Sequence, residues 1–147
     1  MKVLIDADAC PVVDIAVTLC KQTGIECLLL CDTAHVLQRE GAQTLIFDKG
    51  ADSVDFALVN RVTPGDIVIT QDYGLASMCL ARQARVLHQD GWEYTQYNIG
   101  GLMEQRHAAK KFRAAGGRTK GPSKRTALQN TAFNNALQQM LQQSVQG

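Results

Sequence analysis

Carboxylates that directly follow apolar segments are the residues of this sequence with the clearest potential for chemistry. Asp6 and Asp8 follow the apolar segment at the amino terminus, and Asp72 follows a segment that ends at Thr70. Carboxylates that converge at one place raise one another's pKa unless a cation compensates their charge. Mg²⁺ and Mn²⁺ prefer oxygen ligands and keep positions open for phosphate oxygens. The sequence therefore predicts a site for one or two Mg²⁺ or Mn²⁺ ions, with the Thr70 hydroxyl near a bound water or phosphate.

Two further aspartates, Asp52 and Asp55, stand at the start of a predicted helix, and their spacing lets them share one face of it. Some of these acids have a structural explanation when taken alone, because Asp52 and Asp8 each precede a predicted helix and can cap its amino terminus. The joint placement of Asp6 and Asp72 after two different strands is harder to explain in that way. All five acids are therefore candidate metal ligands, and the strand-end pair is the strongest of them.

The elements that must position these acids alternate between short apolar strands and amphipathic helices. The predicted strands lie at 2–5, 25–31, 45–47, 67–70 and 86–87, and helices are predicted to begin near Pro11, Asp52 and Gly74. Such alternation is typical of a parallel sheet between two helix layers, which binds ligands where the carboxyl ends of its strands meet. We expect a three-layer α/β fold with a mostly parallel sheet of about five strands. The assumed strand order 3-2-1-4-5 makes the first and fourth strands neighbours and brings Asp6 close to Asp72.

The composition is that of one globular domain without a membrane segment. The chain has 147 residues and a mass of 16.0 kDa, and 46% of its residues are hydrophobic, which is ample for a core. This excludes a chain that is disordered throughout. No apolar segment approaches the roughly 20 residues of a membrane helix, and the acid at position 6 is too early for a signal peptide. We therefore expect one cytoplasmic domain spanning residues 1–147 and no membrane partner.

The charged residues are divided unevenly along the chain. Residues 1–104 hold all 14 acidic residues and 7 basic residues, whereas residues 105–147 hold 8 basic residues and no acid. A basic segment on an acidic body is typical of proteins that bind nucleic acid, and the alternative is a solvated helix that pairs with the body. We expect residues 99–147 to form a basic helical extension of the domain that binds RNA or DNA. The candidate phosphate-contacting residues are Arg106, Lys110, Lys111, Arg113, Arg118, Lys120, Lys124 and Arg125.

The five cysteines lie in mostly apolar segments, and their odd number favours reduced, buried thiols over a disulfide framework. Cys27, Cys31 and His35 have a spacing compatible with zinc. Both cysteines fall in a predicted buried strand, however, and no fourth ligand is obvious. Cys10 lies beside the acidic motif, where carboxylates raise the pKa of a thiol. We therefore expect the cysteines to pack rather than to react.

Two segments carry a resemblance to a known family: DADACPV at residues 6–12 and GDIVITQDYGLA at residues 65–76. Further agreement lies at residues 50–55, 98–99 and 120–122, so it extends over nearly the whole chain. On these motifs the chain resembles the bacterial YaiI/YqxD family of uncharacterised proteins, which is similar to PIN-domain nucleases. The resemblance implies one PIN-like α/β domain with an acidic Mg²⁺ or Mn²⁺ site that hydrolyses phosphodiester bonds of RNA or DNA.

The resemblance also implies roles for individual residues. Asp6 matches the first-strand acid of PIN-like domains, and Asp72 matches their later strand-end acid. Asp55, in preference to Asp52, matches the helix-borne acid between them. Asp8 is particular to the family's own motif and is implied as a ligand or as the neighbour of a ligand.

In the last helix the chain departs from the family. Gln129 and Asn130 stand where the resemblance implies an acidic pair. The last helix therefore supplies no carboxylate for the site, and the tail is more basic than the resemblance implies.

Two other functions stay open from the sequence. The Asp6-x-Asp8 pair also resembles haloacid-dehalogenase phosphatases, in which the first Asp is a nucleophile and the second a general acid, although Cys10 stands where those enzymes have Thr or Val. A non-catalytic protein with the same PIN-like fold would instead bind nucleic acid without turnover, with an affinity that falls steeply with salt.

Overall fold

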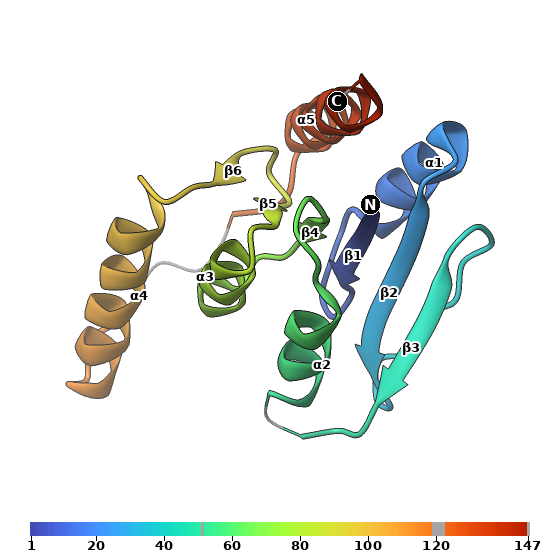
Figure 1. The fold of residues 1–147 in the computed structure, drawn as a ribbon. Coiled ribbons are helices and arrows are strands. Elements are labelled where there is room, and N and C mark those ends of the chain that lie inside the picture. Colours follow the sequence, from blue (N-terminus) through green and yellow to red (C-terminus); the bar gives the residue numbers. More distant parts are fainter. Residues whose placement is uncertain (51, 119–122, 147) are drawn as a thin grey trace.

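The chain folds around one β-sheet with helices on both of its faces (Figure 1). The computed structural model describes residues 1–50, 52–118 and 123–146. The elements in these residues are β1 (Lys2–Asp6), α1 (Val13–Thr23), β2 (Glu26–Asp32), β3 (Gln43–Phe47), α2 (Ser53–Arg61), β4 (Ile67–Ile69), α3 (Tyr73–Ala81), β5 (Arg85–Leu87), β6 (Glu93–Tyr94), α4 (Ile99–Ala114) and α5 (Ala127–Gln146).

The described strands have the order β3-β2-β1-β4-β5-β6. The first five pair in parallel, and β6 pairs antiparallel to β5. The expected order 3-2-1-4-5 is therefore confirmed, and β6 extends the sheet by one strand. Because β1 lies between β2 and β4, the carboxyl ends of these three strands meet at one edge of the sheet.

Alternating side chains along β1 explain why helices cover both faces of the sheet. Val3 and Ile5 belong to the core beneath α1 and α5, whereas Leu4 belongs to the core beneath α2 and α3. All three side chains are fully buried. Burying an aliphatic side chain of this size contributes about 1.5–3 kcal/mol, so both helix layers are held by the same strand. The expected three-layer α/β fold is thereby confirmed.

The final helix, α5, packs into the core rather than extending from it. Phe133, Leu137 and Leu141 recur at helical spacing and are fully buried against α1 and the sheet. Gly91 lies directly beneath this helix with a φ of +92°, and a Cβ added there would come within 2.6 Å of the backbone of Ala132. The basic segment that begins near residue 99 is therefore composed of two different structural parts.

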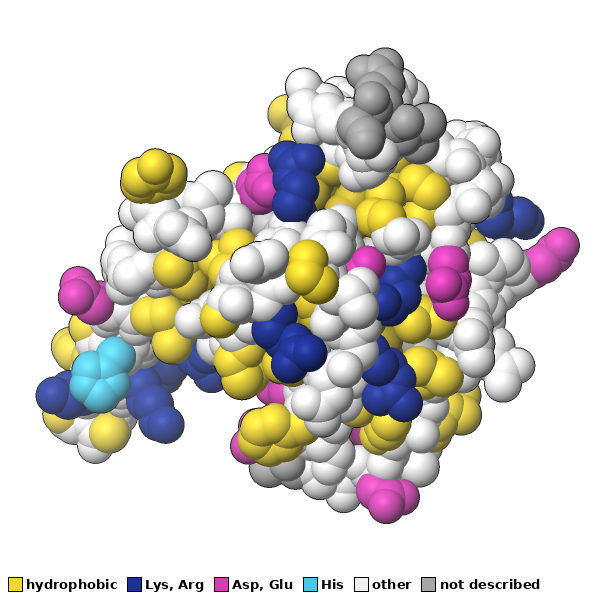
Figure 2. All heavy atoms as spheres, in the orientation of Figure 1, with side chains coloured by type: hydrophobic (Ala, Val, Ile, Leu, Met, Phe, Trp, Pro, Cys, Tyr) yellow, Lys and Arg dark blue, Asp and Glu magenta, His cyan; other side chains and the backbone are white. Residues whose placement is uncertain are grey.

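The other part, α4, lies at the outside of the domain beside α3 (Figure 1). None of its residues is buried, and its last turn carries Lys111 and Arg113. Figure 2 shows Lys and Arg side chains gathered at the lower end of this helix. No helix in the described ranges is both long enough and apolar enough to cross a membrane.

A buried aspartate holds the amino-terminal edge of the β1–β4 pair. The Asp66 carboxylate accepts hydrogen bonds from the Lys2 backbone N (3.1 Å) and Nζ (2.7 Å) and from the Thr63 backbone N (2.8 Å) and Oγ1 (2.9 Å). Burial alone would raise the pKa of Asp66, but the bonds from Lys2 and Thr63 lower it below its usual value. This edge lies opposite the edge where β1 and β4 end.

Candidate metal centre

An acidic cleft of about 270 Å³ opens at the carboxyl ends of the central strands. Asp6 ends β1 and Asp72 lies three residues after β4, and both line this cleft as the strand order predicts. The complete lining is Asp6, Asp8, Ala9, Asp32, Gly50, Asp52, Val54, Asp55, Gln71 and Asp72. Six carboxylates therefore face one space, and all five acids that the sequence singled out are among them.

Asp6 is held in the cleft by a hydrogen bond from Thr70, which also contacts Asp72. The Thr70 hydroxyl donates a hydrogen bond to Asp6 Oδ2 (3.0 Å) and accepts one from the backbone N of Asp72 (3.0 Å). Burial raises the pKa of Asp6 to about 6, the Thr70 bond opposes this rise, and the charges of Asp55, Asp72 and Asp8 add to it. Thr70 therefore holds the Asp6 carboxylate and the Asp72 backbone in a fixed relation.

Asp72 is the N-cap of α3, and its position follows from that role. Its Oδ1 accepts hydrogen bonds from the backbone N of Gly74 (2.8 Å) and of Leu75 (3.2 Å). The same oxygen also accepts a bond from Arg106 Nη1 of α4 at 3.2 Å. A Cβ at Gly74 would lie 3.3 Å from Asp72 Oδ1 and 3.2 Å from Arg106 Nη1, so glycine keeps this junction open.

The helix α2 brings Asp55 and Asp52 to the opposite wall. Asp55 is half-buried, and burial followed by the charges of Asp72 and Asp52 raises its pKa, while Arg106 lowers it. Asp52 stands at the N-cap position with a φ of +69°, but its side chain makes no capping hydrogen bond. The capping explanation for Asp52 is therefore not supported by the geometry. Asp8 also makes no cap, because the N-cap of α1 is Val12.

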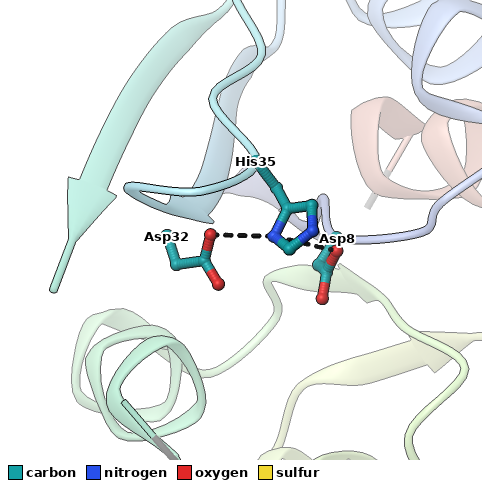
Figure 3. A group of neighbouring side chains, drawn as sticks. All are labelled: Asp8, Asp32 and His35. Atoms are coloured by element: carbon teal, nitrogen blue, oxygen red, sulfur yellow. Dashed lines mark hydrogen bonds and ion pairs between the residues drawn. The ribbon is translucent and has the colours of Figure 1, made fainter. Parts of the chain in front are cut away.

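Asp8 instead belongs to a second group with Asp32 and His35 (Figure 3). His35 Nδ1 lies 2.9 Å from Asp32 Oδ1 and 3.6 Å from Asp8 Oδ1, and the imidazole ring lies between the two carboxylates. The hydrogen bond from His35 lowers the pKa of Asp32. Sequence reasoning missed both Asp32 and the role of His35, although Asp32 ends a strand as Asp6 does.

The two groups of acids differ in how closely their donor atoms approach. Among the described residues, Asp8, Asp32 and His35 are the only such group whose ligand atoms all lie within 4.8 Å of one another. Asp6, Asp55 and Asp72 line the same cleft in a wider arrangement. Mg²⁺ keeps several of its waters in proteins, so a hydrated ion can span carboxylates that do not touch one another.

The cysteines lie apart from both groups. Cys27 and Cys31 are buried in the core on the α1 side of β2, away from the exposed His35. Burial raises the pKa of the Cys10 thiol to about 11 and that of Cys79 to about 12, so both stay protonated at neutral pH. These positions agree with the expectation that the cysteines pack rather than react.

The basic residues singled out from the sequence lie in different surroundings. Arg106 reaches the acidic cleft, and Lys110, Lys111 and Arg113 share α4 with it. Arg118 and Lys124 are exposed on either side of residues 119–122, and Lys120 lies outside the described residues.

Arg125 makes contacts that give it a structural role. It donates hydrogen bonds to Asp90 Oδ1 (2.8 Å), to the Gln89 carbonyl (2.6 Å) and to Asn130 Oδ1 (2.7 Å). These bonds tie the start of α5 to the loop between β5 and β6. Asn130, one of these partners, belongs to α5.

A second pocket, of about 440 Å³, adjoins the acidic cleft between α2, α3 and α4. It shares Asp52, Asp55 and Asp72 with the cleft and is also lined by Arg106. Three exposed apolar side chains, Phe56, Met78 and Met103, complete its wall. Each comes from a different helix, so no local sequence pattern could have grouped them.

Comparisons with known proteins follow the chain along nearly its whole length. A family model described as "Uncharacterized BCR, YaiI/YqxD family" matches residues 4–143. A UPF0178 protein of Exiguobacterium sibiricum is 50% identical over 141 residues, which cover 96% of each chain. The UPF0178 proteins of Natranaerobius thermophilus (41% identical, 97% of each chain) and Ruminiclostridium cellulolyticum (46% identical, 93% of this chain and 90% of the relative) are also similar. No solved structure matches the chain significantly.

Proposed function

The chain belongs to the YaiI/YqxD family, and from its acidic cleft we propose that it hydrolyses phosphodiester bonds of RNA or DNA with the help of Mg²⁺ or Mn²⁺. The observation that carries this proposal is the convergence of Asp6, Asp55 and Asp72 from β1, α2 and the start of α3 on one cleft. Burial and neighbouring like charges both cost free energy when these acids ionise, and the pKa values of Asp6 and Asp55 are raised as a result. A divalent cation removes the cost.

The donors in the cleft fit a hard divalent cation. They are carboxylate oxygens, and such ligands suit Mg²⁺ and Mn²⁺. Asp6, Asp55 and Asp72 would hold the ion, with Asp8 and Asp52 at the rim. When bound, a divalent ion supplies positive charge that lowers the pKa of a coordinated water and stabilises charge on a phosphate.

The protein's own residues contribute orientation and charge. Thr70 fixes the Asp6 carboxylate through a 3.0 Å hydrogen bond, so one ligand is held before any ion arrives. Backbone N–H groups of α3 hold Asp72 in the same way. Because these contacts fix the donors in advance, little reorganisation accompanies the chemical step, and catalysis would be mainly electrostatic.

Arg106 and α4 would hold the nucleic-acid backbone. Arg106 already reaches Asp72 at the cleft, and Lys110 follows one helical turn later on the same helix. The neighbouring pocket offers Phe56 as an exposed aromatic surface, and bases stack on such surfaces with about 1–3 kcal/mol per base. A polymeric substrate would therefore have contacts on one side of the acidic cleft.

The test compares Asp55→Asn with the matched surface variant Asp14→Asn. Asp55 faces the cleft, whereas Asp14 is exposed on α1 and pairs with Arg39. We expect wild type and Asp14→Asn to cleave labelled RNA or DNA oligonucleotides with Mn²⁺ or Mg²⁺ but not with chelator. We expect Asp55→Asn to be slower by about 100-fold or more, as for loss of one electrostatic group in an active site. Equal cleavage by Asp55→Asn and wild type would refute the proposal.

The same measurements separate the other functions. A phosphoaspartate trapped at Asp6 would favour the phosphatase mechanism, because the proposed hydrolysis has no covalent intermediate. Salt-sensitive binding of the oligonucleotides by wild type without any cleavage would favour a non-catalytic nucleic-acid-binding protein.

A further inference from the structure

We propose that Asp8, Asp32 and His35 form a second divalent-ion site, selective for a transition-metal ion such as Mn²⁺, at the rim of the acidic cleft. Asp8 and Asp32 line that cleft, and His35, in the loop that follows β2, lies between their carboxylates (Figure 3). This inference rests on the proposed function in one respect, namely that a first ion binds at Asp6, Asp55 and Asp72. The second site itself can be tested without any nuclease assay.

The separations of both carboxylates from His35 Nδ1 suit a shared cation. His35 Nδ1 lies 2.9 Å from Asp32 Oδ1 and 3.6 Å from Asp8 Oδ1, and all three ligand atoms lie within 4.8 Å of one another. With metal–ligand distances of about 2.1 Å, adjacent ligands are about 3.0 Å apart in an octahedral site and about 3.4 Å apart in a tetrahedral one. The two measured separations from Nδ1 bracket these values.

The ends of β1 and β2 and the loops that follow them bring these residues together. In the parallel β1–β2 pair, Asp6 lies opposite Leu30, so Asp8, two residues beyond the end of β1, follows the same edge of the sheet at which Asp32 ends β2. The Ala34 backbone N donates to Asp32 Oδ1 (2.9 Å), which turns the chain and returns His35 to the same carboxylate. The register of the sheet and this turn therefore build the group.

The group is accessible to an ion from solvent. The exposed fractions of the side chains are 55% for His35 and 50% for Asp8, against 19% for Asp32. An incoming ion would replace the contact between His35 and Asp32, with the imidazole proton on Nε2 so that Nδ1 is a ligand. Asp32 would remain beneath the ion as the more sheltered ligand.

The donor chemistry distinguishes this group from Asp6, Asp55 and Asp72. Those residues offer only carboxylate oxygens, whereas His35 adds an imidazole nitrogen. Mg²⁺ prefers oxygen ligands, and imidazole favours first-row transition metals. One cleft would thus contain a site that accepts either Mg²⁺ or Mn²⁺ and a second site that selects Mn²⁺ over Mg²⁺.

The experiment measures Mn²⁺ binding to the metal-stripped full chain by electron paramagnetic resonance, with pulsed detection of ¹⁴N coupling. His35→Ala is compared with Asp55→Asn and with His107→Ala, which removes an exposed histidine of α4. We expect wild type and His107→Ala to bind two Mn²⁺ ions, one of them coupled to ¹⁴N. We expect His35→Ala to bind one ion at least about tenfold more weakly and to lose the coupling, since even residues behind a ligand change affinity by that factor. Excess Mg²⁺ should displace the uncoupled ion first.

The outcomes separate this inference from the proposed function. Unchanged Mn²⁺ binding in His35→Ala, or the absence of ¹⁴N coupling in wild type, overturns the second site whether or not the protein is a nuclease. Loss of the coupled ion in His35→Ala supports the site even if Asp55→Asn cleaves like wild type, a result that would refute only the proposed hydrolysis.

Discussion

Replacing Asp6 with Asn should stabilise the metal-free protein at neutral pH while weakening cation binding. Asp6 is held beside Thr70 in a group of like charges, and its pKa is raised by burial from 3.8 to about 6. Ionisation of this carboxyl therefore destabilises the folded state relative to the unfolded chain. Asn keeps an oxygen for the Thr70 hydroxyl and carries no charge.

The sign and size of the effect follow from this shift. Between pH 3.8 and about 6 the folded state binds more protons at Asp6 than the unfolded state, so stability falls as pH rises through that window. Above it the full penalty applies, about 3 kcal/mol for a shift of this size at 1.36 kcal/mol per pKa unit. Asp6→Asn should therefore exceed wild type by up to about 3 kcal/mol at pH 7.5 and by about half of that at pH 5.

Urea unfolding of the chelator-treated proteins at several pH values provides the assay, with Asp14→Asn as the exposed control. We expect the control to stay within about 0.5 kcal/mol of wild type, as surface substitutions do. Added Mn²⁺ should stabilise wild type more than Asp6→Asn. Our reasoning about the cleft is wrong if Asp6→Asn is less stable than wild type at pH 7.5, or if their difference does not change with pH.

Three other substitutions test separate parts of the structure. Thr70→Val removes a hydrogen bond that lowers the pKa of Asp6. A carboxyl NMR titration should therefore show the pKa of Asp6 rising above about 6. The affinity for Mn²⁺ at pH 7 should fall by about tenfold. Arg106→Gln should weaken oligonucleotide binding and reduce the slope of log K against log salt by about one, measured by anisotropy; an unchanged slope would remove Arg106 from the interface. Phe133→Ala should lower the free energy of unfolding, measured in urea, by about 3–5 kcal/mol. Leu128, on the same helix, is 80% exposed, so Leu128→Ala should have little effect. Equal losses of stability in the two variants would argue against α5 as part of the core.

Much of the fold was predictable because its signals are local. The apolar segments are short and buried on both faces, so they appear in the sequence as continuous apolar runs. The convergence of Asp6 and Asp72 was also predictable, because both follow strands that the assumed order makes neighbours. The burial of α5 was harder to predict, because its stripe of Phe133, Leu137 and Leu141 lies among polar residues, many of them glutamines.

Other parts of the site depend on contacts between distant segments. Arg106 reaches Asp72 only because α4 packs on α3, and nothing within residues 99–114 indicates that partner. The group of Asp8 with Asp32 and His35 depends on the register between β1 and β2, which the sequence does not specify to the residue.

Asp66 and Asp6, at opposite ends of the β1–β4 pair, make the stability of the metal-free protein depend on pH in opposite ways. Asp66, whose pKa is lowered, supplies stability that disappears only in acid stronger than its ordinary value, while Asp6 supplies a penalty that disappears as soon as it is protonated. In chelator, lowering the pH from neutrality to about 5 should therefore remove part of the penalty at Asp6 while the contribution of Asp66 is kept. Bound Mn²⁺ should make stability at neutral pH less dependent on protonation of Asp6, because the ion then compensates the charge of that carboxylate.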